Sequence, residues 1–138
     1  MNLKIKNALV SVSDKEKLIS LLKVFKKYKI RIISSGGTYK SIKKLGYACT
    51  EISKYTGFKE MLDGRVKTLH PKIHAGILHD RQNKTHKNEM SRKKFPPIDL
   101  IIVNFYPFQK VVRHSKNPKN IIENIDIGGP TLVRAAAK

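Results

Sequence analysis

The sequence predicts an α/β domain, with a mainly parallel sheet between layers of helices in a three-layer fold. Short runs of branched apolar residues alternate with helical segments, and the connections between them are short. The most apolar run, 98–105, has the composition of a central strand buried on both faces. At 138 residues, the chain is expected to form a single domain, 1–138.

The first strand and helix are predicted within the first 28 residues. Residues 8–12 form the apolar strand, and Ser13 and Asp14 follow it as candidate N-caps of a helix that extends to about Tyr28. The apolar face of this helix has spacings of three, four and seven: Leu18, Leu21, Leu22 and Phe25. This spacing is typical of an amphipathic helix packed on a sheet.

A second strand and helix follow directly. Residues 30–34 predict the strand, and the polar loop 35–38 interrupts it. A helix over 39–45 is expected to end at Gly46, which is a natural C-cap. Residues 48–52 are a weaker candidate for a third strand because Glu51 interrupts the apolar run.

The second half of the chain has fewer regular signals. Residues 54–79 are irregular and polar, and a long irregular segment in a compact domain is usually functional. Residues 82–94 predict a charged helix or an exposed loop. A helix is expected to begin at Pro118 and run to 124, with a turn at 126–130 before a last helix, 131–138. That helix reaches the end of the chain without a cap, so we expect a domain truncated at its C-terminus.

The net charge is strongly positive. There are 29 Lys and Arg residues against 10 Asp and Glu, giving +19, which raises the alternative of nucleic-acid binding. Only 6 of the 29 are Arg, the residue best suited to bidentate recognition, and the lysines are dispersed along the chain. We therefore favour compositional drift toward Lys, Ile and Asn, and expect no specific nucleic-acid partner.

Compartment is inferred from the cysteine content and the apolar runs. Cys49 is the one cysteine, so no intramolecular disulfide can form, and a reducing, cytoplasmic setting is expected. No signal peptide and no run of about 20 apolar residues is recognisable, so no membrane association is expected.

Two polar loops are candidate phosphate sites because they follow predicted parallel strands. They are 11–15, with Ser13, Asp14 and Lys15, and 35–38, with Ser35, Gly36, Gly37 and Thr38. Glycine amides, hydroxyl groups and an ammonium group at the carboxyl ends of strands suit a bound anion. Each loop taken separately is also explained as a turn with a helix cap.

Three further clusters carry polar groups. The segment 65–74 holds His70 and His74 with several cations, but Pro71 and the lack of a Glu in the second position argue against zinc. A basic surface loop is the alternative. In 104–108, Asn104 and Tyr106 are candidate ligand donors, whereas Phe105 and Phe108 are expected in the core. The amides of 126–129 precede a helix and could stabilise an oxyanion, or form a simple capped turn.

Taken together, seven segments strongly resemble the IMP cyclohydrolase domain of the bifunctional purine-biosynthesis enzymes. They are 11–15, 35–38, 56–58, 60–71, 104–108, 125–129 and 134–138. The resemblance runs from about residue 8 to 138. It implies a methylglyoxal-synthase-like fold and closure of 5-formamidoimidazole-4-carboxamide ribonucleotide to inosine monophosphate (IMP) and water. The same resemblance implies that a formyltransferase domain, which uses 10-formyltetrahydrofolate, is missing here.

The resemblance also implies roles for individual residues. Those expected in catalysis are Lys67, Tyr106, Asp126 and Lys138, with the amides of Ile127 and Gly128 as an oxyanion hole. Those expected to bind the purine nucleotide are Ser13, Asp14, Lys15, Ser35, Gly36, Gly37, Thr38, Arg65, Lys67, Thr68, Val103, Asn104, Asp126, Ile127 and Gly128. No metal or cofactor is expected for this step, and a homodimer is compatible with the sequence.

Lys138 ends an uncapped helix, which would loosen its geometry. Reduced or absent turnover of this chain alone is therefore expected. The alternatives are a nucleotide- or phosphate-binding regulatory module of the same fold and a catalytically weak remnant.

Overall fold

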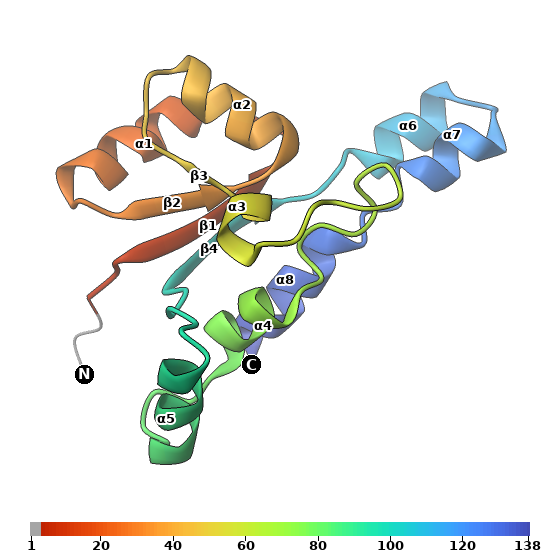
Figure 1. Ribbon diagram of the computed structural model, residues 1–138. Helices are drawn as coiled ribbons and strands as arrows, with labels where there is room; N and C mark the ends of the chain where they lie inside the picture. Colours follow the sequence, from red (N-terminus) through yellow and green to blue (C-terminus); the bar gives the residue numbers. More distant parts are fainter. Residues whose placement is uncertain (1–3) are drawn as a thin grey trace.

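Four parallel strands form one sheet in the computed structural model, which describes residues 4–138 (Figure 1). The strands are β1 (Asn7–Val12), β2 (Arg31–Ser34), β3 (Thr50–Glu51) and β4 (Leu100–Asn104). Their order in the sheet is β3-β2-β1-β4, with Leu9 paired to Ile33 on one side and to Ile101 on the other. The predicted parallel α/β sheet is confirmed.

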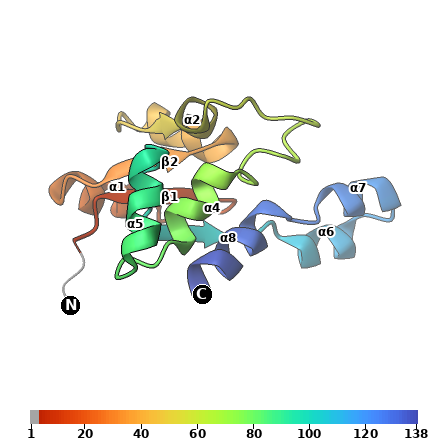
Figure 2. The same cartoon turned by 60° about the horizontal axis from the view of Figure 1, so that its bottom comes forward.

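Helices connect the strands and cover both faces of the sheet. Within the described residues they are α1 (Leu18–Lys27), α2 (Gly36–Lys44), α3 (Ile52–Thr56), α4 (Pro71–Leu78), α5 (Lys84–Arg92), α6 (Phe108–His114), α7 (Pro118–Glu123) and α8 (Gly128–Ala137). Figure 2 shows α6 and α7 as a helical hairpin that projects from the body of the molecule. No helix of residues 4–138 has the length and apolar character to cross a membrane.

The alternation of side chains along β1 produces two apolar clusters, one on each face. Ala8 and Val10 are buried with residues of α1 and α2, including Leu22. Leu9 points to the opposite face, where α3, α4 and α8 pack, and Leu132 of α8 is fully buried there. This arrangement is the predicted three-layer fold.

The amino ends of β1 and β4 are joined by a buried carboxylate. Asp99 accepts hydrogen bonds of 2.8 Å from the amides of Lys6 and Asn7 and forms a 2.7 Å ion pair with Arg81. Burial by itself would raise the pKa of Asp99, but the Arg81 and backbone hydrogen bonds outweigh it and lower this pKa below its ordinary value. These contacts fix the end of the sheet opposite the polar loops.

The prediction of a central position for β4 was wrong. Among the described residues β4 pairs only with β1, and β1 is an inner strand. The first four residues of β4 are half-buried because α1 packs against one face of the strand and α8 against the other. An apolar run indicates that other elements cover both faces of a strand, but it does not indicate which strands are its neighbours in the sheet.

Three helix starts also differ from the predictions. α1 begins at Leu18, and neither Ser13 nor Asp14 caps it. α2 and α8 begin at Gly36 and Gly128, so the glycines predicted as turns form first helical turns. Gly46 follows α2 with φ of +80° and ends it as predicted.

The segment 54–79, predicted as irregular, contains the end of α3 and all of α4, and 57–70 between these helices is a loop. Pro71 begins α4 instead of breaking it, because the first helical residue needs no amide proton.

Phe105 and Phe108, expected in the core, are 50% and 41% exposed. The helical hairpin that begins at Phe108 projects outward and offers them no core.

Candidate functional site

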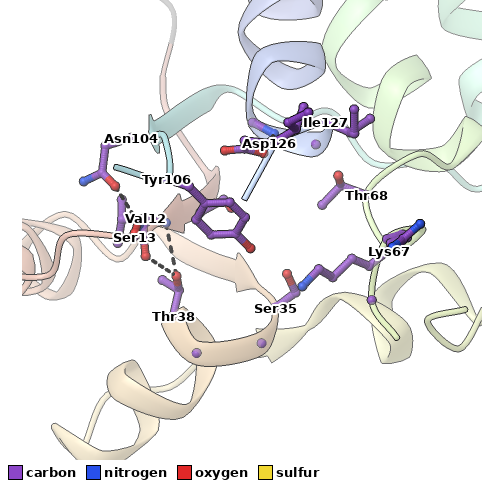
Figure 3. A pocket seen from close by; sticks show the side chains of 18 of the residues that line it. Val12, Ser13, Ser35, Thr38, Lys67, Thr68, Asn104, Tyr106, Asp126 and Ile127 are labelled. Atoms are coloured by element: carbon purple, nitrogen blue, oxygen red, sulfur yellow. Dashed lines mark hydrogen bonds between the residues drawn. The ribbon is translucent and has the colours of Figure 1, made fainter. Parts of the chain in front are cut away.

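A cavity of about 580 Å³ lies at the carboxyl ends of β1, β2 and β4. The loops after these strands, the loop 57–70, the end of α7 and the N-termini of α2 and α8 form its walls (Figure 3). Parallel strands bring their carboxyl ends to one edge, which explains why residues far apart in sequence meet here.

One wall of the cavity is built from the two polar loops, 11–15 and 35–38. Lys15 donates a 2.9 Å hydrogen bond from Nζ to the Ser13 carbonyl, and this ammonium group lies 3.9 Å from where a Cβ on Gly37 would stand. Ser35 and Gly36 line the same wall. The first amides of α2 have no acceptors within the helix, so this wall suits an anion.

Two predicted ligand donors instead hold the loops in place. Thr38 donates from Oγ1 to the Val12 carbonyl at 2.9 Å and accepts from the Val12 amide at 3.1 Å. Asn104 accepts from the amides of Ser13 and Asp14 at 2.6 and 3.0 Å, and donates to the Asp14 carbonyl. Both side chains line the cavity and position its backbone.

Lys67 extends across the cavity toward Ser35, as Figure 3 shows. Its Nζ lies 3.5 Å from a Cβ position on Gly36 and 3.3 Å from one on Gly64, so both glycines leave room for the ammonium group. Glu60 Oε2 is 3.4 Å from the same position on Gly64. A carboxylate therefore lies near the ammonium group of Lys67.

The N-terminus of α8 forms another part of the wall. Asp126 accepts a 2.9 Å hydrogen bond from the Gly129 amide, which fixes the turn before the helix. The Gly128 amide is the first of α8 and has no intrahelical acceptor. Thr68 is 5% exposed, and its Oγ1 lies 2.9 Å from a Cβ position on Gly128. A side chain at 128 would displace this hydroxyl group.

Part of the remaining cavity surface is apolar. The Tyr106 ring lies inside the cavity in Figure 3 and is 44% exposed. Three isoleucine side chains that are each at least half exposed also line the cavity: Ile122, Ile125 and Ile127. A ligand with a charged end and a flat apolar body fits these two kinds of wall.

Most predicted site residues meet in this cavity, and three do not. Asp14 accepts from the Glu16 amide and lines a separate, smaller hollow. Val103 packs in the apolar cluster under α8. Lys138 directly follows α8 and is ten residues from Gly128, and at 1.5 Å per residue its backbone lies about 15 Å from the cavity end of the helix. Its catalytic role stays a prediction.

The structure also adds residues for which the sequence predicted no role in the site. Glu123 pairs with Arg65 across the rim of the cavity, and Ile122, Ile125 and Asp63 contribute to its lining. Residues 65 and 123 are 58 positions apart. No spacing or local pattern connects them, so sequence reasoning had no signal for this pair.

The two histidines of the 65–74 segment have structural contacts. His70 is the N-cap of α4 and accepts from the Lys72 amide at 3.1 Å through Nδ1. Burial lowers the pKa of His74, and its Nε2 has no hydrogen-bond partner among the described residues. Within residues 4–138, no three His, Cys, Asp or Glu side chains form a group that could hold a metal ion.

Cys49, the one cysteine, lies outside the cavity and is half-buried. Burial raises the pKa of its thiol to about 11, so the thiolate is scarce at neutral pH.

A cavity at the carboxyl ends of parallel strands is the usual position of a ligand site in open α/β domains. The family model described as "MGS-like domain" matches residues 17–131, and the chain belongs to this family. The fold agrees with the crystal structure of ForH, with a TM-score of 0.82 and 30% identity, covering 96% of this chain and 68% of that one.

Curated relatives give a narrower comparison. The chain is 50% identical to the bifunctional purine biosynthesis protein PurH of Rhodospirillum rubrum over 137 residues, which are 99% of this chain and 26% of that protein. It is also 50% identical to PurH of Clostridium acetobutylicum over 134 residues, 97% of this chain and 27% of that protein. The chain thus spans about a quarter of the length of the curated relatives it matches.

Proposed function

We propose that this chain carries the IMP cyclohydrolase step of purine biosynthesis. The observation that supports this most strongly is the convergence of Lys67, Tyr106 and Asp126 on one cavity with an anion-binding wall. These residues come from three separate segments and are those that the resemblance to cyclohydrolases implies. The 50% identity to PurH proteins over nearly the whole chain is consistent with the same proposal.

In the proposed complex, the nucleotide phosphate lies against Lys15 and the first amides of α2, where both the ammonium charge and the helix dipole favour an anion. The imidazole ring of the substrate lies between Tyr106 and the apolar wall formed by Ile122 and Ile125. This placement would leave the formyl and carboxamide groups near Lys67 and the N-terminus of α8.

Ring closure forms a bond from the carboxamide nitrogen to the formyl carbon, and the formyl oxygen leaves as water. One proton leaves each of the two nitrogens during the reaction. Lys67 would act at the formyl oxygen, and the amides of Ile127 and Gly128 would stabilise the developing oxyanion. Asp126, held by the Gly129 amide, would fix these amides in position. The proposed step uses no metal or organic cofactor.

A nucleotide-binding module that does not turn over is the second candidate. The position of Lys138, at the opposite end of α8 from the cavity, favours it. In such a module the anion wall and apolar wall would still bind a purine nucleotide. The proton transfer implied for Lys138 would be missing, and so would the catalytic rate.

An assay of IMP formation from the formylated precursor separates the two candidates. We expect at most slow turnover by this chain, which Lys67→Ala removes and Lys87→Ala on the exposed face of α5 retains. Lys87→Ala is a matched control because it removes the same charge far from the cavity. IMP binding without turnover would favour the module, and a chain that neither binds IMP nor forms it would refute both candidates.

A further inference from the structure

The Arg65–Glu123 ion pair joins two segments that project from the body of the protein. Arg65 belongs to the loop 57–70, and Glu123 is the last residue of α7 in the hairpin formed by α6 and α7. Neither α6 nor α7 has a buried residue, and Figures 1 and 2 both show the hairpin extending away from the sheet. Both paired residues line the cavity, so the pair lies across its rim.

The two partners differ in how firmly their backbones are held. Met61 and Val66 exchange backbone hydrogen bonds of 3.0 and 3.2 Å, and the Arg65 amide donates to the Leu62 carbonyl at 3.1 Å. This tight turn fixes the backbone that carries Arg65. Glu123 is instead carried by a hairpin without buried side chains, whose described contacts are mainly between its own two helices. When the pair opens, the hairpin is therefore the part expected to move.

The ion pair itself is weak enough to exchange partners. Its side chains are 62% and 56% exposed, and pairs so exposed to water contribute little to stability. A guanidinium group accepts a carboxylate or another anionic oxygen in the same forked geometry. An anionic or carbonyl oxygen of a ligand can thus replace the Glu123 carboxylate on Arg65 at little cost.

We propose that Glu123 acts as an internal competitor for Arg65, so that a nucleotide entering the cavity must displace its carboxylate from the guanidinium group. The Arg65–Glu123 pair is then a gate between the loop 57–70 and the helical hairpin. Glu123 is a positioning residue for Arg65 and touches no reacting atom. This inference rests on the nucleotide-binding part of the proposed function.

The proposed gate predicts that removing the charge of Glu123 increases the affinity for IMP. Glu123→Gln keeps the size of the side chain but removes the competing charge, so IMP should bind more tightly. Because an exposed pair contributes about 0.2–1 kcal/mol, the expected gain is about 1.5- to 5-fold in affinity. A purely structural role in holding the hairpin predicts the opposite, since losing the pair would loosen the cavity wall and weaken binding.

Calorimetric titration with IMP at one fixed salt concentration measures this effect. Glu89→Gln on the exposed face of α5 is the matched control, because it makes the same change in net charge away from the cavity. Tighter binding by Glu123→Gln than by Glu89→Gln supports the gate, and equal or weaker binding overturns it. If the wild-type chain and both variants fail to bind IMP, the proposed function fails as well, whereas wild-type binding with no gain in Glu123→Gln refutes the gate alone.

Discussion

Replacement of Gly129 by alanine tests how tightly the N-terminus of α8 is built. A Cβ at this position would stand 2.6 Å from Asp126 Oδ2 and 3.0 Å from Cδ1 of Phe105. Asp126 is bound to the Gly129 amide by its other oxygen, so its carboxylate cannot withdraw without losing that hydrogen bond. Gly129→Ala should therefore force the carboxylate out of the turn.

The matched control is Gly37→Ala. Gly37 is the second residue of α2, as Gly129 is the second residue of α8, and its added Cβ meets only Lys15 Nζ at 3.9 Å. Overpacking costs about 1–3 kcal/mol, and loss of a capping hydrogen bond costs about 1 kcal/mol. The higher helix propensity of alanine offsets part of this loss of stability, but the offset is the same in both helices. Gly129→Ala should be less stable than Gly37→Ala by about 2 kcal/mol.

Urea unfolding followed by circular dichroism measures the difference, and a domain of this size should also lose roughly 8 °C in Tm. Combining Gly129→Ala with Asp126→Ala should recover part of the loss, because the clashing carboxylate is then absent. Equal stability of the two glycine variants, or strict additivity with Asp126→Ala, would refute this reading of the turn.

Three further predictions concern the other end of the sheet and the lysines. Asp99→Asn should cost about 3 kcal/mol at neutral pH by leaving Arg81 without its buried partner. Because the pKa of Asp99 is lowered in the folded protein, its stabilising effect is present at neutral pH and is lost as pH falls below about 4. The free energy of unfolding should therefore depend less steeply on pH in the acid range for Asp99→Asn than for the wild type. An unchanged pH dependence would contradict this prediction. Lys67→Ala should weaken IMP binding about tenfold or more in calorimetry, since a charged contact is lost. Lys138→Ala should change the same affinity less than twofold, and a large loss would show that Lys138 reaches the ligand.

Much of the fold could be predicted because its signals are local. The branched runs at 8–12 and 30–34 are strands, and the apolar spacing after residue 17 gives the helix that covers them. The loop 57–70 lies within the segment 54–79 that its lack of periodicity predicts as irregular, but the sequence does not predict α3 and α4 on either side of the loop. Short helices with few apolar residues leave little periodic signal.

The candidate site was predicted mainly as separate loops. Ser13, Lys15, Gly36 and Gly37 were chosen because they follow strands, and the structure does bring them to one cavity. The hydrogen bonds by which Thr38 and Asn104 hold the loops could not be predicted, since their partners Val12 and Ser13 are 26 and 91 residues away in the sequence. Such contacts depend on which strands are neighbours.

By itself the sequence determined the strands and the main helices, the three-layer arrangement and the residue types available for binding an anion, because these depend on hydrophobic periodicity and local chemistry. Only the tertiary structure decided that β1 is an inner strand, that Arg65 meets Glu123 and that Lys138 lies away from the cavity. The physical reason is that strand order and helix direction are set by packing between distant segments. The two ends of a ten-residue helix such as α8 lie in different environments, even when the sequence predicts that residues at both ends belong to one site.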